Sequence, residues 1–64
     1  MTVKELKKGD YFTLKEIPFP SDSQVWIRGE YDRGSKTYSA VNFADVNRER
    51  FFPGKKAVYV DFTF

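Results

Sequence analysis

Residues 24–43 have the sequence QVWIRGEYDRGSKTYSAVNF, and this pattern predicts a β-hairpin. Gln24–Tyr31 and Lys36–Phe43 are rich in β-branched and aromatic residues, which favour strands. The polar segment between them contains Gly34, a residue typical of hairpin turns. We therefore expect two antiparallel strands in the middle of the chain, with the other segments arranged around them.

Alternation along the hairpin predicts that one face is buried and the other lies in water. The expected buried face is the mostly apolar one, which in the simplest register pairs Val25 with Phe43, Ile27 with Val41 and Gly29 with Ser39. The expected water-facing side carries Trp26, Arg28, Glu30, Tyr38, Ala40 and Asn42. A bulge at the turn would shift this pairing by one residue.

The N-terminal segment contains a helix-start signal and then a strand. Thr2 and Glu5 have the spacing of a capping box, which predicts one helical turn over Val3–Lys7. Leu6 would then point inward. A first strand is expected over Tyr11–Lys15, because this segment is aromatic and β-branched and follows a Gly-Asp turn.

Two connections flank the hairpin. Glu16–Ser23 contains two prolines, which exclude a central strand, so we expect a loop there. Ala44–Arg48 is expected to form a tight turn or a single 3₁₀ turn, with Asp45 as a cap. A longer helix over Phe43–Phe52 is the competing interpretation. It ranks lower because Asn47 and the two adjacent phenylalanines are poor helix formers.

A second hairpin is predicted at the C-terminal end. Its strands would be Arg50–Phe52 and Ala57–Phe62, joined across the Pro-Gly-Lys-Lys turn. The side chains expected to point inward are Phe51, Val58, Val60 and Phe62. Arg50 and Tyr59 are expected to point outward.

These elements predict one all-β domain spanning residues 1–64, a small five-stranded SH3-like barrel with one short helical or 3₁₀ turn. Closure of the barrel would remove exposed strand edges. An OB-like closure also uses five strands and remains the alternative. Because the chain has no cysteine for a disulfide, we expect its seven Phe, four Tyr and one Trp to supply most of the core.

Three segments also resemble known proteins. Val3–Phe12 is similar to the leu-x-x-gly-asp-hydrophobic segment that begins many SH3-like small barrels. Gly29–Arg33 and Tyr59–Phe64 resemble segments of short uncharacterised SH3-like β-barrel proteins of gut Bacteroides-type bacteria and their mobile elements. No activity is assigned to those proteins, so the resemblance implies a fold and no functional residues. Peptide-binding SH3 domains are a poorer match, because Pro18–Pro20 stands in place of their acidic first loop.

The composition argues against catalysis. The chain has no His and no Cys, the residues most often used as general base, nucleophile or structural zinc ligand. Its carboxylates lie next to arginines in the sequence, so surface ion pairing is the simpler interpretation of them. We therefore expect no enzyme, no cofactor and no small-molecule substrate.

Charge and hydropathy limit the partners. Eleven basic and nine acidic residues leave a formal charge of +2, which supports only mild attraction to anions. There is no apolar run long enough to cross a membrane, and Met1–Lys8 has no apolar signal core. We expect no membrane partner and a cytoplasmic location.

Single-stranded nucleic acid is the favoured ligand in this interpretation. Such binding needs a basic groove and exposed rings on which bases stack. The residues expected to provide them are Trp26, Arg28, Arg33, Lys36, Tyr38, Arg50 and Tyr59. The alternative is that Trp26 packs under the Pro18–Ser23 loop and that Tyr38 only pairs across the strands.

Protein interaction is the second hypothesis and ranks almost level. Phe19, between two prolines, could anchor a partner, and Phe64 at the C-terminal end could insert into a partner or complete the barrel. Trp26 would contribute from the same water-facing side of the hairpin. A homodimer through an edge strand would also enlarge the small core. The simpler alternative for Phe19 is that it folds back onto the core.

Overall fold

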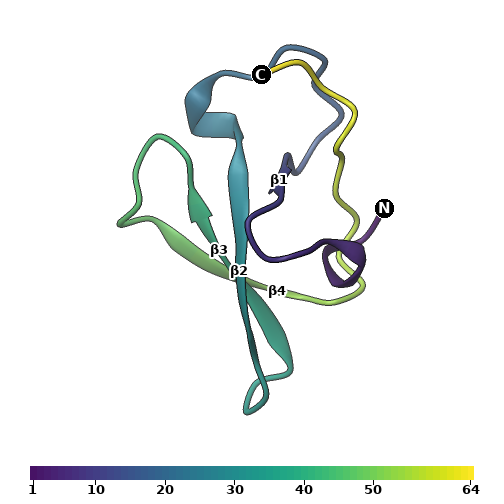
Figure 1. Cartoon of the computed structure of the whole chain (residues 1–64), viewed down its shortest axis with the longest axis vertical. Coiled ribbons are helices and arrows are strands. Elements are labelled where there is room, and N and C mark those ends of the chain that lie inside the picture. Colours follow the sequence, from purple (N-terminus) through teal and green to yellow (C-terminus); the bar gives the residue numbers. More distant parts are fainter.

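The computed structural model describes all 64 residues as a four-stranded antiparallel sheet with two short 3₁₀ turns (Figure 1). In chain order the elements are η1 (Val3–Glu5), β1 (Tyr11–Phe12), η2 (Asp22–Gln24), β2 (Trp26–Asp32), β3 (Thr37–Asn42) and β4 (Glu49–Pro53). The strands lie side by side in the order β1-β2-β3-β4. The predicted all-β class is confirmed at this level.

The central hairpin forms in the predicted register over its first half. Ile27 lies opposite Val41, and the Phe43 N–H donates to the carbonyl oxygen of Val25 at 2.9 Å. The register then shifts between Arg28 and Tyr31, so the irregularity lies within β2 and not at the turn. This shift changes the pairing of the last residues of β2, because each inserted residue displaces the partner by one position.

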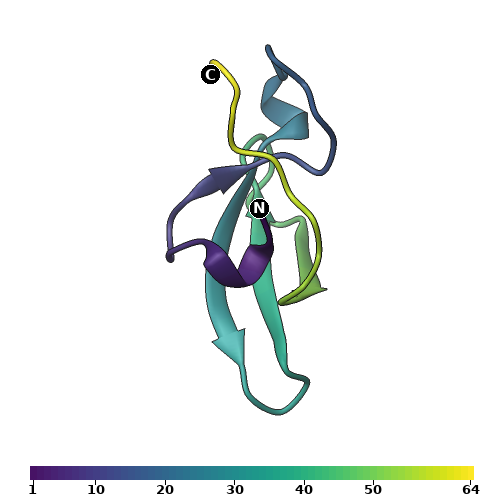
Figure 2. The same cartoon turned by 90° about the vertical axis from the view of Figure 1, so that its right-hand side faces the viewer.

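The hairpin turn is closed by side-chain hydrogen bonds. One carboxylate oxygen of Asp32 accepts from the Gly34 N–H at 2.9 Å and the other from the Ser35 hydroxyl at 3.1 Å. Lys36 has φ 57°, the left-handed conformation that side chains rarely adopt. In both views the hairpin projects away from the two chain ends (Figures 1 and 2).

The core lies on the face of the sheet that carries Trp26. Its apolar members are Val3, Leu6, Phe12, Trp26, Ala40, Phe52 and Val58. Only 4% of the Trp26 surface is exposed, and its ring packs edge-on to Phe52 with centroids 6.2 Å apart. This face is covered by η1 and the C-terminal segment, which Figure 2 shows next to each other beside the strands.

The predicted assignment of faces is therefore wrong for most of the hairpin. Trp26, Ala40 and Asn42 are buried, whereas Phe43 is exposed and Ile27 is only partly buried. Both faces of the sheet carry large apolar side chains, so alternation alone does not select one. The chain segments that pack on a face make the selection, and the indole offers more area to bury than an isoleucine does.

Burial of Asn42 is possible because both ends of its amide are bonded. Its Nδ2 donates to the carbonyl oxygen of Ser23 at 2.9 Å, and its Oδ1 accepts from the Ala44 N–H at 3.0 Å. Buried polar groups in proteins are almost always paired in this way. The amide thus joins the end of β3 to η2, which lies 19 residues earlier in the chain.

The N-terminal prediction is confirmed in its chemistry. The Thr2 backbone N–H donates to Glu5 Oε1 at 2.9 Å, completing the capping box, and Leu6 is buried. The turn is a 3₁₀ helix of three residues, shorter than Val3–Lys7. β1 is likewise shorter than Tyr11–Lys15, since only two residues belong to a continuous ladder.

The predicted second hairpin is wrong. β4 pairs only with β3, and after a turn at Pro53 the chain returns to the N-terminal residues. Ala57 forms an isolated bridge with Thr2, and Tyr59 forms another with Thr13. Because these two partners belong to separate segments, no continuous fifth ladder develops, and the sheet remains open.

Side-chain directions in this region differ from the prediction in part. Phe52 is buried and Phe51 is exposed, the reverse of the expected arrangement. Val58 is buried as predicted, whereas Val60 is exposed. The predicted tight turn at Ala44–Arg48 is confirmed, with the Arg48 N–H donating to the Asp45 carbonyl oxygen at 2.9 Å, and the competing helix is absent.

Candidate interaction surfaces

The face of the sheet opposite the core is apolar and has no layer over it. We call it the outer aromatic face, and it comprises Tyr11, Ile27, Val41, Phe43, Phe51 and Phe64. Strand pairing places Tyr11 opposite Ile27, and Ile27 opposite Val41. Antiparallel sheets usually carry polar side chains on the side that is not packed, so an apolar uncovered side is an exception.

Three rings of this face contact one another. The Phe43 and Phe64 rings are perpendicular, with centroids 4.7 Å apart, and Tyr11 lies 5.8 Å from Phe43 and 6.0 Å from Phe64. Edge-to-face geometry of this kind is favourable for aromatic pairs. The C-terminal segment is held in place because the Thr63 N–H donates to the carbonyl oxygen of Pro18 at 2.9 Å.

The rings remain substantially exposed although they pack together. The exposed fractions are 43% for Tyr11, 37% for Phe43, 53% for Phe51 and 48% for Phe64. A whole aromatic side chain offers about 200 Å², so these four leave roughly 360 Å² of ring surface uncovered. An exposed apolar area of this size equals the largest patch on a typical monomer, which is often functional.

A second surface lies on the other side of the hairpin and is basic. The Arg28 guanidinium carbon is 4.4 Å from the centroid of the Tyr38 ring, a cation–π contact. The Tyr31 ring lies 4.7 Å from that of Tyr38 at an interplanar angle of 48°. The bulge in β2 makes this pairing, since it moves Tyr31 opposite Tyr38.

The residues predicted to bind nucleic acid are only partly brought together. Arg28 and Tyr38 are in contact, and Arg33 and Lys36 lie at the turn of the same hairpin. Trp26 is buried, so the prediction that it forms an exposed stacking platform is wrong.

The remaining members of that set lie elsewhere. The guanidinium of Arg50 is 5.9 Å from the Trp26 ring and 5.3 Å from that of Phe52. It helps to cover the indole, together with Arg48 at 5.6 Å. Tyr59 belongs to the C-terminal segment, where it pairs with Thr13 away from the hairpin turn.

The residues predicted to anchor a protein partner do not form one surface. Phe19 is 78% exposed, so it does not fold back onto the core, and no ring packs against it. Phe64 belongs to the outer aromatic face. Sequence reasoning missed Tyr11 and Tyr31 as surface residues and assigned Phe43 and Phe51 to the core. No local signal distinguishes these rings from buried ones, because burial depends on which segments cover the sheet.

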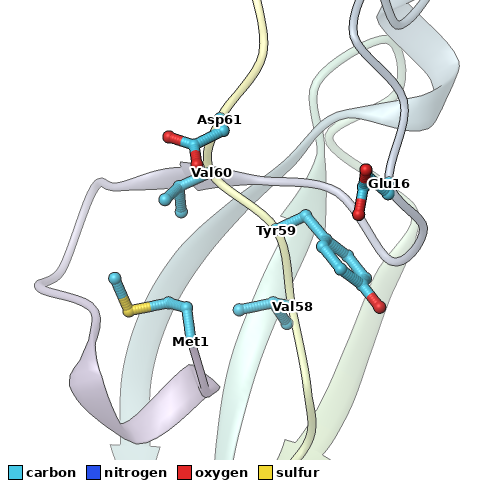
Figure 3. A pocket seen from close by; sticks show the side chains of 6 residues that line it. All are labelled: Met1, Glu16, Val58, Tyr59, Val60 and Asp61. Carbon is cyan, nitrogen blue, oxygen red and sulfur yellow. The ribbon is translucent and has the colours of Figure 1, made fainter.

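The largest pocket, of about 410 Å³, lies beside the C-terminal segment (Figure 3). It is lined by Met1, Glu16, Val58, Tyr59, Val60 and Asp61. Figure 3 shows its two carboxylates, from Glu16 and Asp61, on either side of the Tyr59 backbone. No ion pair or side-chain hydrogen bond joins the groups of this pocket. No group of three or more metal-ligating side chains occurs anywhere in the chain.

Two exposed carboxyl groups have a lowered pKa. Hydrogen bonds from the side chain and backbone of Thr2 hold the pKa of Glu5 below its ordinary value of 4.5. The hydrogen bond and charge of Lys8 do the same for the pKa of Glu30. Both groups serve local structure, and neither belongs to a cavity.

Comparisons with protein-family models, with curated proteins and with solved structures found no match to this chain. None of the helices is long and apolar enough to span a membrane. The surfaces described above are therefore the basis for any assignment of function.

Proposed function

We propose that this chain is a non-catalytic protein-interaction module that self-associates through its outer aromatic face. The observation that carries the proposal is the half-exposed ring cluster of Tyr11, Phe43 and Phe64, which with Phe51 extends an apolar surface across an uncovered sheet. Exposed apolar surface of this extent matches the largest patch on a typical monomer, and such patches are often functional.

The area supports a dimer of moderate affinity. If two copies bury their four rings, about 720 Å² of aromatic surface leaves water, which contributes about 18 kcal/mol at 25 cal/mol per Å². Association itself costs about 4–15 kcal/mol. The difference of about 3–14 kcal/mol includes micromolar dissociation. Because about 720 Å² is less than the roughly 1,200 Å² of a standard specific interface, the dimer should be transient.

A second copy is the partner that this surface suits. The six residues of the outer aromatic face include no cation, and strand pairing places two carboxylates on the same side, Glu49 opposite Val41 and Asp32 opposite Thr37. A strongly charged partner would therefore gain little, whereas an equally apolar sheet face would match it. In a two-fold dimer each copy supplies the same face, so the interface doubles the area that one copy provides.

We also propose that the fold is an open relative of the SH3-like barrel, with the C-terminal segment in the place of the fifth strand. The support is the strand order and the isolated bridge between Thr13 and Tyr59, which links that segment to the end of β1. The energetics of self-association do not depend on this assignment.

Sedimentation equilibrium tests the proposal. The apparent mass should rise from 7.5 kDa toward twice that value as the concentration increases through the micromolar range. Phe51→Ser and Phe43→Ser should each weaken association at least about tenfold, because each variant removes apolar area from both halves of the interface.

Phe19→Ser is the matched control, since Phe19 is more exposed than either ring and lies outside the outer aromatic face. It should leave association unchanged. A wild-type protein that stays monomeric at about 1 mM, near the weak limit of measurable association, would refute the proposal. Equal effects of Phe19→Ser and Phe51→Ser would refute it too, because they would indicate non-specific sticking.

A further inference from the structure

We propose that the basic side of the β2–β3 hairpin binds single-stranded nucleic acid, independently of self-association. This hairpin surface comprises Lys4, Arg28, Tyr31, Arg33, Lys36 and Tyr38. Two backbone hydrogen bonds fix the position of Arg28. Its carbonyl oxygen accepts from the Gly9 N–H at 2.8 Å, and its N–H donates to the backbone carbonyl oxygen of Asp10 at 2.9 Å.

The Arg28 side chain is held by an aromatic ring and has no acceptor. Its guanidinium lies over Tyr38, its Nε is buried without a hydrogen-bond partner, and it forms no ion pair. An arginine fixed in this way has lost conformational freedom before any ligand arrives. Its terminal nitrogens are therefore prepared to donate to a phosphate, for which the planar fork is well suited.

Tyr31 gives the same surface an accessible ring. It is 45% exposed, and it packs at a tilt against Tyr38, which is itself only partly buried. A tyrosine that is supported from one side and open on the other offers a face on which a base can stack. Its neighbour Arg28 would lie within reach of the phosphate attached to that base, since both contact the Tyr38 ring.

Further cations surround these rings. Arg33 and Lys36 are exposed at the hairpin turn and form no ion pair. Lys4 lies at the other end of this surface. Its Cβ and the Tyr38 ring both lie close to Gly54, 3.2 and 3.1 Å from the position that a Cβ on this glycine would take.

The nearby carboxylates offset this charge only in part, and Glu30 interacts with the charge of Arg28 as well as with Lys8. Glu30 is bonded to Lys8, and Asp32 accepts from the turn residues Gly34 and Ser35. Of these two, only Asp32 adds a negative charge without a paired cation, so the hairpin surface keeps a net formal charge of about +3. Four cations within one surface predict a steep salt dependence, with a slope of log affinity on log salt concentration between about −2 and −3.

The hairpin turn and the C-terminus, whose Phe64 belongs to the ring cluster, lie at opposite ends of the molecule (Figure 1), so the two surfaces can be tested separately. The probe is a fluorescein-labelled oligothymidylate of about 12 nucleotides, and the readout is fluorescence anisotropy at about 50 and 200 mM NaCl. The wild type should bind more weakly at the higher salt concentration with the slope given above.

Variants distinguish stacking from simple attraction. Tyr31→Ser should weaken binding by between about 5-fold and 100-fold, the range expected for loss of one stacked base. Tyr59→Ser is the matched control, because this tyrosine is also exposed but lies outside the hairpin surface. Arg28→Gln should weaken binding and lower the salt slope by about 0.7, as expected for one lost phosphate contact. Arg28→Lys should recover the slope but not the full affinity.

Three results would overturn the inference. The first is no binding at about 50 mM NaCl, where phosphate contacts are strongest. The second is a Tyr31→Ser variant that binds like the wild type, together with equal losses of binding from Lys15→Gln and Arg33→Gln. Lys15 is an exposed cation outside the hairpin surface, so equal losses would indicate unspecific attraction. The third is equal competition by polyglutamate, which would identify an acidic peptide as the ligand. The folded state of each variant is checked by Trp26 fluorescence. The two proposals can fail separately. A wild type that binds the oligonucleotide but stays monomeric refutes only the proposed function, and one that dimerises without binding refutes only this inference.

Discussion

Asn42→Ala should destabilise the protein strongly, although asparagine is a polar residue that the hairpin pattern assigns to water. In the structure this side chain is fully buried at the end of β3. Its amide donates to Ser23 and accepts from Ala44, so it holds η2 and the turn after β3 against the sheet. The substitution removes both bonds and leaves a small cavity opposite Trp26, its cross-strand partner.

The expected loss follows from these two bonds. A buried group that loses its hydrogen-bond partner costs about 1–3 kcal/mol. Ser23 and Ala44 are exposed residues, so water can replace part of each lost bond and lower this cost. We therefore expect the free energy of unfolding to fall by about 2–4 kcal/mol. A chain of 64 residues has a total stability of only about 3–10 kcal/mol, so the variant loses a large share of it.

Urea unfolding followed by Trp26 fluorescence measures this loss. With a slope of about 1 kcal/mol per M, the midpoint should fall by about 2 M or more. Asn47→Ala is the matched control, because its side chain is exposed and makes no hydrogen bond, and it should change stability by less than about 0.5 kcal/mol. Equal midpoints for the two variants would show that Asn42 does not brace η2 and the turn, and the reasoning would be refuted.

The remaining predictions concern the core, acid stability and one strained position. Trp26 emission should be blue-shifted and shielded from acrylamide in the native state, since the ring is 4% exposed, and a red, quenchable emission would contradict the assignment of faces. The pKa of Glu5 is lower in the folded state, so its stabilising contribution is present above its ordinary pKa of 4.5 and is lost as the pH falls through the folded value. Glu5→Gln should therefore reduce the acid sensitivity of the urea midpoint, and an unchanged pH profile would count against the capping box. Gly9 has φ 93°, so Gly9→Ala should cost about 1–2 kcal/mol, whereas Gly34→Ala, where φ is not positive, should cost less in the same urea assay.

Local features of this protein were predictable from sequence. The capping box between Thr2 and Glu5, the Asp45 turn and the register of Ile27 with Val41 all depend on residues close in the chain or on the two-residue period of a strand. Such interactions are determined by short-range geometry, so the residue pattern is enough to specify them. The all-β class follows for the same reason.

The surfaces depend on contacts between distant segments. β2 and β3 carry apolar side chains on both faces, and only the packing of Phe12, η1 and Val58 on one of them buries Trp26 and leaves Phe43 exposed. The bulge that brings Tyr31 against Tyr38 contains Gly29, and a glycine inside a strand signals a bulge or a close approach without saying which rings it will pair. Sequence thus determined the strands and turns through local geometry, whereas tertiary packing alone decided which side chains are buried, because burial requires a covering segment from elsewhere in the chain.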